Sequence, residues 1–298
     1  HRRLLDLSRQ KGEDFNFVLT QYVLERFLYR LAASEYADRF VLKGAMLLAA
    51  RADRSHRPTR DLDLLGYGDA SEQQLTTMFH QICRTDVEPD GLEFDAQSIS
   101  VAEIREEQEY EGKRVKLVAK LGTAQIPIQV DIGFGDVVTP EAMEIDYPTL
   151  LDFPAPRIQA YPLETVIAEK LQAIVVLGVP NSRMKDFYDL WIIAREFSFS
   201  GPLLVRAIKA TFARRQTQIA SVRPIALSDE FATDRNKATQ WKAFLGRISL
   251  EATRVELPQV INELQAFLTP PLFAAAKGEA FAQSWGAGGP WSPRTERR

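Results

Sequence analysis

A short alternation of acidic and apolar residues constrains the fold of this chain more than any other stretch. Residues 61–65 read Asp-Leu-Asp-Leu-Leu, and residues two apart on a β-strand point to the same face. The carboxylates of Asp61 and Asp63 therefore project together, while the leucines between them pack on the other side. Like charges held this close repel unless a cation lies between them, and hard carboxylate oxygens suit Mg²⁺. The alternative is a solvated strand edge with two incidental acids.

The residues before this strand favour a nucleotide site. An apolar run at 40–42 leads into Lys43 and Gly44 and then into a short predicted helix at 45–50, and Arg60 directly precedes the acidic strand. A loop that opens a helix can present backbone N–H groups to a phosphate. We therefore predict that Lys43, Gly44 and Arg60 contact the phosphates of a nucleotide.

A third carboxylate is expected from a neighbouring strand. After a helix predicted at 71–84, the pattern predicts three strands at 94–104, 113–121 and 126–132. Asp131 lies between two β-branched apolar residues of the last strand, so its side chain faces away from theirs. It would complete a two-metal site that aligns an attacking hydroxyl and a triphosphate. Alternatively, Asp131 simply ends a strand at a glycine turn.

The rest of the chain is predicted to form a helical domain. Five prolines between 140 and 162 mark a connector of short extended pieces, and we place the domain boundary there. We expect an α/β (α+β) architecture in which residues 1–160 form a small mixed sheet carrying the carboxylates. Residues 161–270 would form a helical domain that completes the active-site cleft. Residues 271–298 would be a tail, partly disordered, because its end has linker composition.

Charged residues on two predicted helices of the second domain have two interpretations. Lys170 lies on a helix predicted at 163–177, and Arg183, Lys185 and Asp186 open the next helix. The three basic side chains are candidates to hold a triphosphate, and Asp186 is a candidate general base or positioning acid. Alternatively, these residues and Asp189 form an ion-pair network that ties the helices together.

Composition limits the class of function. The chain has 37 basic and 40 acidic residues, so any nucleic-acid binding must be local. Arg26 and Arg30, on a helix predicted at 13–33, are interpreted as a solvated face, with RNA contact as the alternative. The single cysteine, Cys83, excludes a disulfide framework and a cysteine-based zinc cluster. No apolar run approaches the length of a membrane span, and a cytoplasmic protein with no membrane partner is expected.

Five motifs in this order resemble those of the AbiEii/AbiGii-type toxin nucleotidyltransferases, which include the MenT toxins and belong to the DNA polymerase β-like superfamily. The resemblance covers roughly residues 4–200. The motifs are Phe40-Val41-Leu42-Lys43-Gly44, Thr59-Arg60-Asp61-Leu62-Asp63-Leu64, Val130-Asp131-Ile132, Glu169-Lys170-Leu171 and Arg183-Met184-Lys185-Asp186-Phe187-Tyr188-Asp189-Leu190.

The resemblance implies the activity and its partners. It implies a toxin of a toxin–antitoxin or phage-defence pair, with a polymerase β-like nucleotidyltransferase domain, that uses a nucleoside triphosphate (NTP) and Mg²⁺ to modify RNA. Some such toxins add nucleotides to the 3′ end of tRNA and so block aminoacylation and translation. A cognate antitoxin protein encoded alongside would neutralise the toxin.

Carried over to matching positions, the resemblance also implies residue roles. Asp61 and Asp63 would be metal ligands, Lys170 a triphosphate contact and Asp186 the essential acid. The superfamily pattern adds Asp131 as a third metal ligand.

The phosphate loop departs from the family pattern in one residue. Ala45 stands where the superfamily usually has serine or glycine, so the hydrogen bond that a serine hydroxyl would donate to the phosphates would be missing. Two alternatives therefore stay open. One is a kinase or nucleotidyltransferase on the same scaffold that acts on protein, and the other is a non-catalytic module that binds RNA or a protein partner.

Overall fold

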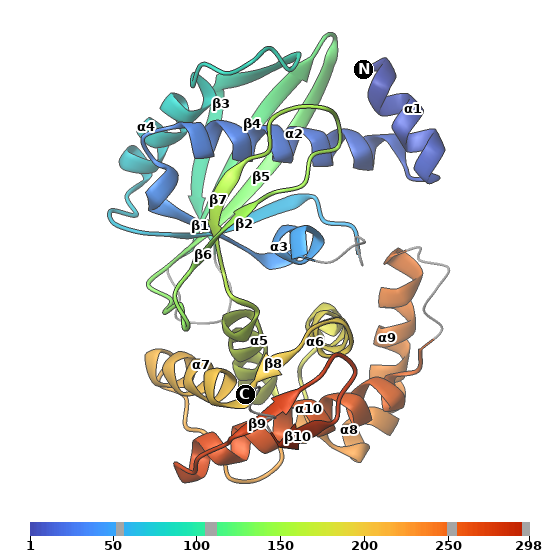
Figure 1. Cartoon of the computed structure of the whole chain (residues 1–298). Helices are drawn as coiled ribbons and strands as arrows, with labels where there is room; N and C mark the ends of the chain where they lie inside the picture. The colour runs from blue at the N-terminus through green and yellow to red at the C-terminus, as the bar shows by residue number, and fades with distance from the viewer. Residues whose placement is uncertain (52–56, 105–111, 249–254, 294–298) are drawn as a thin grey trace, which may run out of the picture. The chain divides into compact units, whose positions relative to one another are not determined.

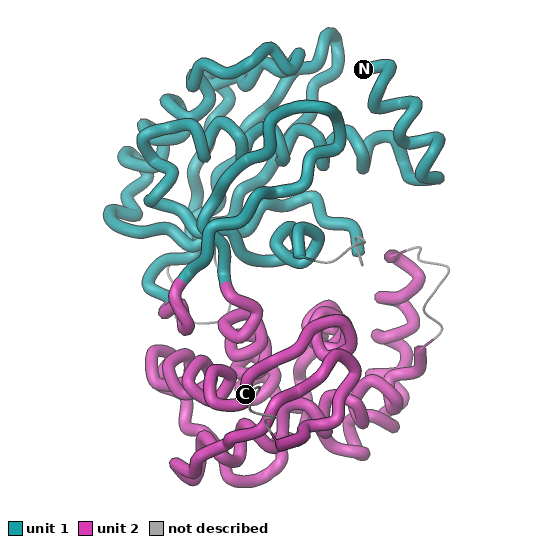
Figure 2. Tube along the Cα trace, viewed as in Figure 1, with its two compact units in different colours: residues 1–136, 142–161 teal, residues 137–141, 162–298 magenta. Residues whose placement is uncertain are grey.

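The chain divides into two compact units (Figure 2), seen in a computed structural model that describes residues 1–51, 57–104, 112–248 and 255–293. Unit 1 comprises His1–Asp136 and Ala142–Tyr161, and unit 2 comprises Val137–Glu141 and Pro162–Arg298. Among the described residues, no helix is both long enough and apolar enough to cross a membrane.

Unit 1 is built on a seven-stranded mixed sheet with the order β3-β4-β5-β2-β1-β7-β6. The acidic strand β2 lies at its centre, parallel to β5 and antiparallel to β1. The predicted mixed sheet is therefore confirmed. Its strands are β1 (Phe40–Lys43), β2 (Asp61–Gly66), β3 (Leu92–Glu103), β4 (Gly112–Leu121), β5 (Ala124–Phe134), β6 (Met143–Asp146) and β7 (Arg157–Ala160).

Helix α2 (Phe15–Ala33) lies across this sheet (Figure 1) and carries much of the core of unit 1. It begins at Phe15, two residues later than predicted, because the Asp14 carboxylate caps it by accepting a hydrogen bond from the backbone N–H of Phe17. Phe27 is fully buried and packs against Phe79 and Phe94 at ring distances of 5.5 and 5.6 Å. The other helices of the unit are α1 (Arg2–Lys11), α3 (Gly44–Arg51), α4 (Glu72–Cys83) and the short 3₁₀ helix η1 (Ala37–Arg39).

The interpretation of Arg26 and Arg30 as a solvated face is wrong, because both side chains are buried. Each pairs with Asp90, which the segment before β3 brings against α2, at 3.1 Å for Arg26 and 2.6 Å for Arg30. Glu25 is buried beside them and accepts a hydrogen bond from the backbone N–H of Leu150. Burial raises the pKa of Glu25 to about 7. The compensating Asp90 is remote in sequence, so helical periodicity could not reveal this cluster.

Unit 2 contains six α-helices and a three-stranded sheet among its described residues. Helix α10 packs on α6 and α7, and α5 packs on α7. The helices are α5 (Leu163–Leu177), α6 (Met184–Glu196), α7 (Gly201–Arg214), α8 (Asp229–Thr233), α9 (Arg235–Ile248) and α10 (Leu257–Lys277), with the 3₁₀ helix η2 (Ile225–Leu227). The strands are β8 (Phe199–Ser200), β9 (Gln283–Trp285) and β10 (Trp291–Pro293).

The segment predicted as a tail, 271–298, is folded over most of its length. Helix α10 continues through two prolines to Lys277, and β9 pairs with β10 on one side and with β8 on the other. Trp285 and Trp291 donate their indole N–H groups to backbone carbonyls of α6 and α10. Linker composition predicted disorder for this segment. The large indole rings instead pack on apolar surface of the fold, which composition alone cannot indicate. Residues 294–298 lie outside the described part of the chain.

Candidate active site

Four charged residues form one row across four neighbouring strands of unit 1. Asp63 on β2 pairs in register with Lys43 on β1 and with Asp131 on β5, and Asp131 pairs in turn with Arg114 on β4. Side chains at paired positions of adjacent strands point to the same face of a sheet. Two acidic residues therefore lie between two basic ones. Asp61, two residues before Asp63 on the same strand, points to the same face.

The Asp63 carboxylate lies against the start of α3. Gly44 has a φ of +72°, and a Cβ there would overlap Oδ2 of Asp63 and lie 2.6 Å from its Cγ. Only glycine fits, because the position needs both a left-handed backbone and an absent side chain. This contact puts the first N–H groups of α3, the donors that helix starts offer to phosphates, beside the acidic strand. Ala45 is buried.

Lys43 and Arg60, the predicted phosphate contacts, have different surroundings. The Lys43 ammonium lies 3.3 Å from a carboxylate oxygen of Asp136 and 5.5 Å from the centre of the Tyr161 ring. Its charge is therefore already engaged by an acid that the sequence did not suggest. Arg60 is exposed at the start of β2.

The Asp131 carboxylate is held by Arg114. Arg114 donates from Nε to Oδ1 and from Nη2 to Oδ2, both at 2.8 Å, and Gln129 adds a hydrogen bond of 3.2 Å to Oδ2. Within the described residues, no group of three or more histidines, cysteines and acids is arranged to hold a metal ion. Asp131 therefore lies on the strand next to Asp63 but is directed to a different partner.

The donor set that fits a metal is the pair Asp61 and Asp63. Asp61 is exposed and Asp63 is partly exposed, so a cation can reach both carboxylates. Mg²⁺ is commonly bound by one or two carboxylates, with waters and substrate phosphates completing its shell. The pair beside the start of α3 fits that requirement. A site that needs three carboxylates does not fit while Arg114 holds Asp131.

In unit 2, Lys170 joins α5 to α6. Its ammonium lies 2.6 Å from Asp186 and 2.9 Å from Asp189, and the three side chains are 15%, 8% and 3% exposed. The ion-pair network considered from the sequence is therefore present for Lys170, Asp186 and Asp189. It does not exclude a role in catalysis, because the same group lies at the start of α6 with half-buried Arg183 and exposed Lys185.

Helix α6 begins at Met184, one residue later than the sequence suggested. Asn181 still accepts a hydrogen bond from the N–H of Arg183, at 2.8 Å. The Asn181 side chain therefore stabilises the turn before the helix, although the helix itself has no side-chain cap.

Sequence reasoning missed Arg114 and Asp136. A signal for Arg114 was available, because β4 and β5 form a hairpin whose strands pair from Leu121 and Ala124 outward. Counting back from this two-residue turn puts Arg114 opposite Asp131. No local signal connects Lys43 with Asp136, which lie 93 residues apart.

Comparison with known proteins gave one family and two structures. The family model described as nucleotidyl transferase AbiEii toxin, type IV TA system, matches residues 26–270. Solved structures of JHP933 from Helicobacter pylori and of a candidate nucleotidyltransferase from H. pylori are each 15% identical, with TM-scores of 0.46. Both alignments cover 87% of this chain, and they cover 93% and 96% of the respective structures. None of the curated proteins matches the sequence.

Proposed function

The chain belongs to the AbiEii family of nucleotidyltransferase toxins of type IV toxin–antitoxin systems, and we propose that it transfers a nucleoside monophosphate from an NTP to the 3′ end of tRNA. The observation that carries this proposal is the pair Asp61 and Asp63 beside the glycine start of α3. A nucleotide added at that end would block aminoacylation and hence translation. We further propose that the protein acts in the cytoplasm and that a cognate antitoxin neutralises it.

Residues of unit 1 would bind and orient the triphosphate. In the reaction, the acceptor hydroxyl oxygen bonds to the α-phosphorus, pyrophosphate leaves and a base takes the hydroxyl proton. Mg²⁺ bound by Asp61 and Asp63 would supply neutralising charge at the phosphates. The N–H groups at the start of α3 would donate hydrogen bonds to phosphate oxygens, which they can do without the hydroxyl that Ala45 lacks.

The roles proposed for residues of unit 2 follow from the family motifs and from the charges of these residues. Lys170, Asp186 and Asp189 together carry a net charge of −1, so this group alone would repel a triphosphate. Adding Arg183 and Lys185 makes the net charge of the group +1. We propose that these two side chains attract the triphosphate, whereas Lys170, which its ion pairs hold in place, contacts a phosphate. Asp186 remains the proposed essential acid, on the family motif.

An RNA acceptor is supported by the charge of α9. This helix has four basic residues and no acidic one, and Arg235, Lys242 and Arg247 are exposed on it. The buried Lys237 donates a 2.8 Å hydrogen bond to the carbonyl of Asn181, which fastens α9 beside the segment that leads into α6. An exposed basic helix next to proposed phosphate contacts suits a polyanionic acceptor.

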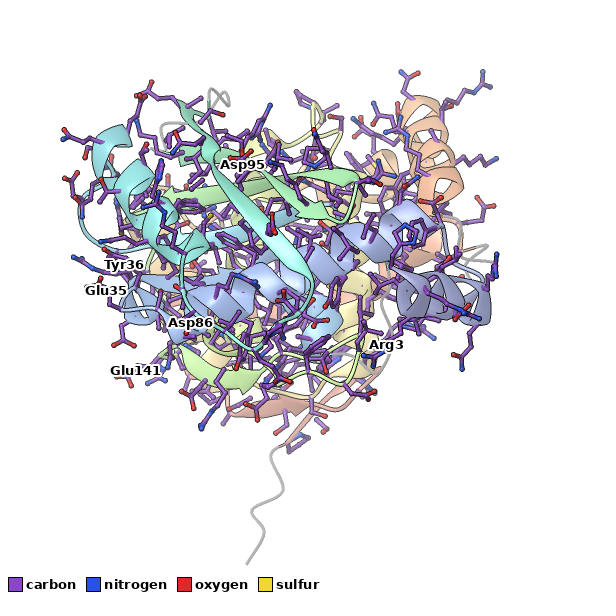
Figure 3. The ribbon with its side chains drawn as sticks, turned by 90° about the horizontal axis from the view of Figure 1, so that it is seen from above. Arg3, Glu35, Tyr36, Asp86, Asp95 and Glu141 are labelled. Atoms are coloured by element: carbon purple, nitrogen blue, oxygen red, sulfur yellow. The ribbon has the colours of Figure 1, made fainter. Side chains whose placement is uncertain are left out.

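The test is transfer of label from NTP to tRNA. The purified protein is incubated with total tRNA, Mg²⁺ and each of the four α-labelled NTPs, beside Asp61→Ala. The matched control is Asp86→Ala, which removes another exposed aspartate of unit 1 (Figure 3). We expect label in tRNA with wild type and Asp86→Ala but not with Asp61→Ala, whose stability should change by no more than about 0.5 kcal/mol because its side chain is exposed.

Two other outcomes would contradict the proposal. Label in protein instead of RNA would select the protein-directed alternative, to which the missing hydroxyl at Ala45 lends weight. No label from any NTP, with a folded chain shown by circular dichroism, would favour a non-catalytic binding module.

A further inference from the structure

We propose that Arg114 is a positioning residue that holds Asp131 away from the Asp61–Asp63 pair and so limits the affinity of that pair for a divalent cation. The proposal rests on the proposed function, because cation binding by Asp61 and Asp63 is part of it. It adds a residue that the family resemblance did not supply and reassigns Asp131, the expected third ligand.

The hydrogen bonds engage both oxygens of Asp131. The planar guanidinium of Arg114 contacts Oδ1 and Oδ2 at 2.8 Å each, the fork geometry that gives the strongest and most directional arginine–carboxylate contacts. Gln129 donates to Oδ2 as well, and Gln129 pairs in register with Asp61. Asp131 is thus oriented by a side chain from β4 and by one from its own strand.

The position of Asp131 makes a choice between two partners possible. Its strand β5 lies between β4 and β2, and Asp131 is level with Arg114 on one side and with Asp63 on the other. Adjacent strands are about 4.8 Å apart, so the carboxylate is within reach of either neighbour. While both oxygens face Arg114, they are not directed at a cation between Asp61 and Asp63.

The contact between Arg114 and Asp131 is exposed enough to solvent for Asp131 to exchange Arg114 for another partner. The side chain of Arg114 is 35% exposed and that of Asp131 is 20% exposed, so solvent weakens the pair relative to a buried one. The row Lys43, Asp63, Asp131 and Arg114 is neutral. Removing the charge of Arg114 leaves it at −1 and frees a carboxylate, and both changes favour a divalent cation.

The experiment is a titration of the full chain with Mn²⁺ in the absence of nucleotide, with free Mn²⁺ followed by electron paramagnetic resonance. We expect Arg114→Gln to bind Mn²⁺ on the order of tenfold more tightly than wild type, comparable to the effect of one neighbouring charge on a pKa. Asp131→Asn, which leaves the row at +1, should bind Mn²⁺ no more tightly than wild type. In the Arg114→Gln background, the same Asp131→Asn change should remove the gain.

Two results would overturn the role of Arg114. If Arg114 instead oriented Asp131 as a metal ligand, its loss would weaken binding by roughly 10- to 100-fold, as loss of outer-shell partners does. Unchanged affinity would mean that Asp131 does not reach the cation. Arg114→Lys, which keeps the charge but not the fork, gives the same test if the glutamine variant does not fold, and a smaller gain is expected.

The Mn²⁺ affinity of Asp61→Asn distinguishes a failure of the role proposed for Arg114 from a failure of the proposed function. Equal Mn²⁺ affinity in wild type and Asp61→Asn would remove the carboxylate pair as a metal site, and the proposed function would lose its main support. Weaker binding in Asp61→Asn without a gain in Arg114→Gln would overturn only the role of Arg114.

Discussion

Replacing Gly44 with alanine would test whether the contact between Asp63 and the start of α3 builds the site. The φ of +72° costs an alanine about 1–2 kcal/mol. The new Cβ would also lie 2.6 Å from Cγ of Asp63, and moving that carboxylate should cost about 1–3 kcal/mol more, as overpacking does. We expect the free energy of unfolding of unit 1 to fall by about 2–5 kcal/mol and nucleotidyl transfer to be lost.

Gly12→Ala is the matched control. Gly12 has a φ of +66°, but no atom lies within 4 Å of a Cβ built on it, so only the backbone cost of about 1–2 kcal/mol should appear and transfer should persist. All four tryptophans lie in unit 2, so tryptophan fluorescence reports the urea unfolding of that unit alone. Far-ultraviolet circular dichroism reports both units, so unfolding of unit 1 is the part of its change that fluorescence does not share. If alanine at position 44 matched alanine at position 12 in both stability and transfer, the reasoning would be refuted.

Three further perturbations test other parts of the chain. Because burial raises the pKa of Glu25 from 4.5 to about 7, the folded chain binds a proton there that the unfolded chain has lost. Stability should therefore fall by about 3 kcal/mol as pH rises from 4.5 to 7, and urea unfolding of Glu25→Gln should not show this loss. Lys170→Met removes the cation that contacts the buried carboxylates of Asp186 and Asp189, and it should lower the stability of unit 2 by about 3–5 kcal/mol. Unchanged fluorescence-detected unfolding would contradict a stabilising role for the ion pairs of Lys170. Lys242→Glu with Arg247→Glu should weaken tRNA binding and reduce the slope of log affinity against log salt by roughly 1–2, whereas Lys277→Glu, at an exposed helix end, should change neither.

The sequence determined the features that depend on near neighbours. The alternation at 61–65 specified a strand with both carboxylates on one face, and β2 has these bounds to within one residue. Asp14 and Ser71 cap α2 and α4 as their residue types predict, because a side-chain oxygen three residues before a helical N–H can satisfy it. The motifs were also specific enough to identify the family, since they combine residue type with order along the chain.

Only the tertiary structure decided which charges meet. Asp63 lies between Lys43 and Asp131 because β2 is inserted between β1 and β5, strands that the sequence separates widely. Arg26 and Arg30 are buried because Asp90 reaches them from a remote segment. The hairpin register put Arg114 opposite Asp131, but only the folded sheet determined that the pair would lie beside the acidic strand. A side chain's own neighbours determine its local conformation, whereas its charge environment depends on strand order and packing, which are set by contacts between distant residues.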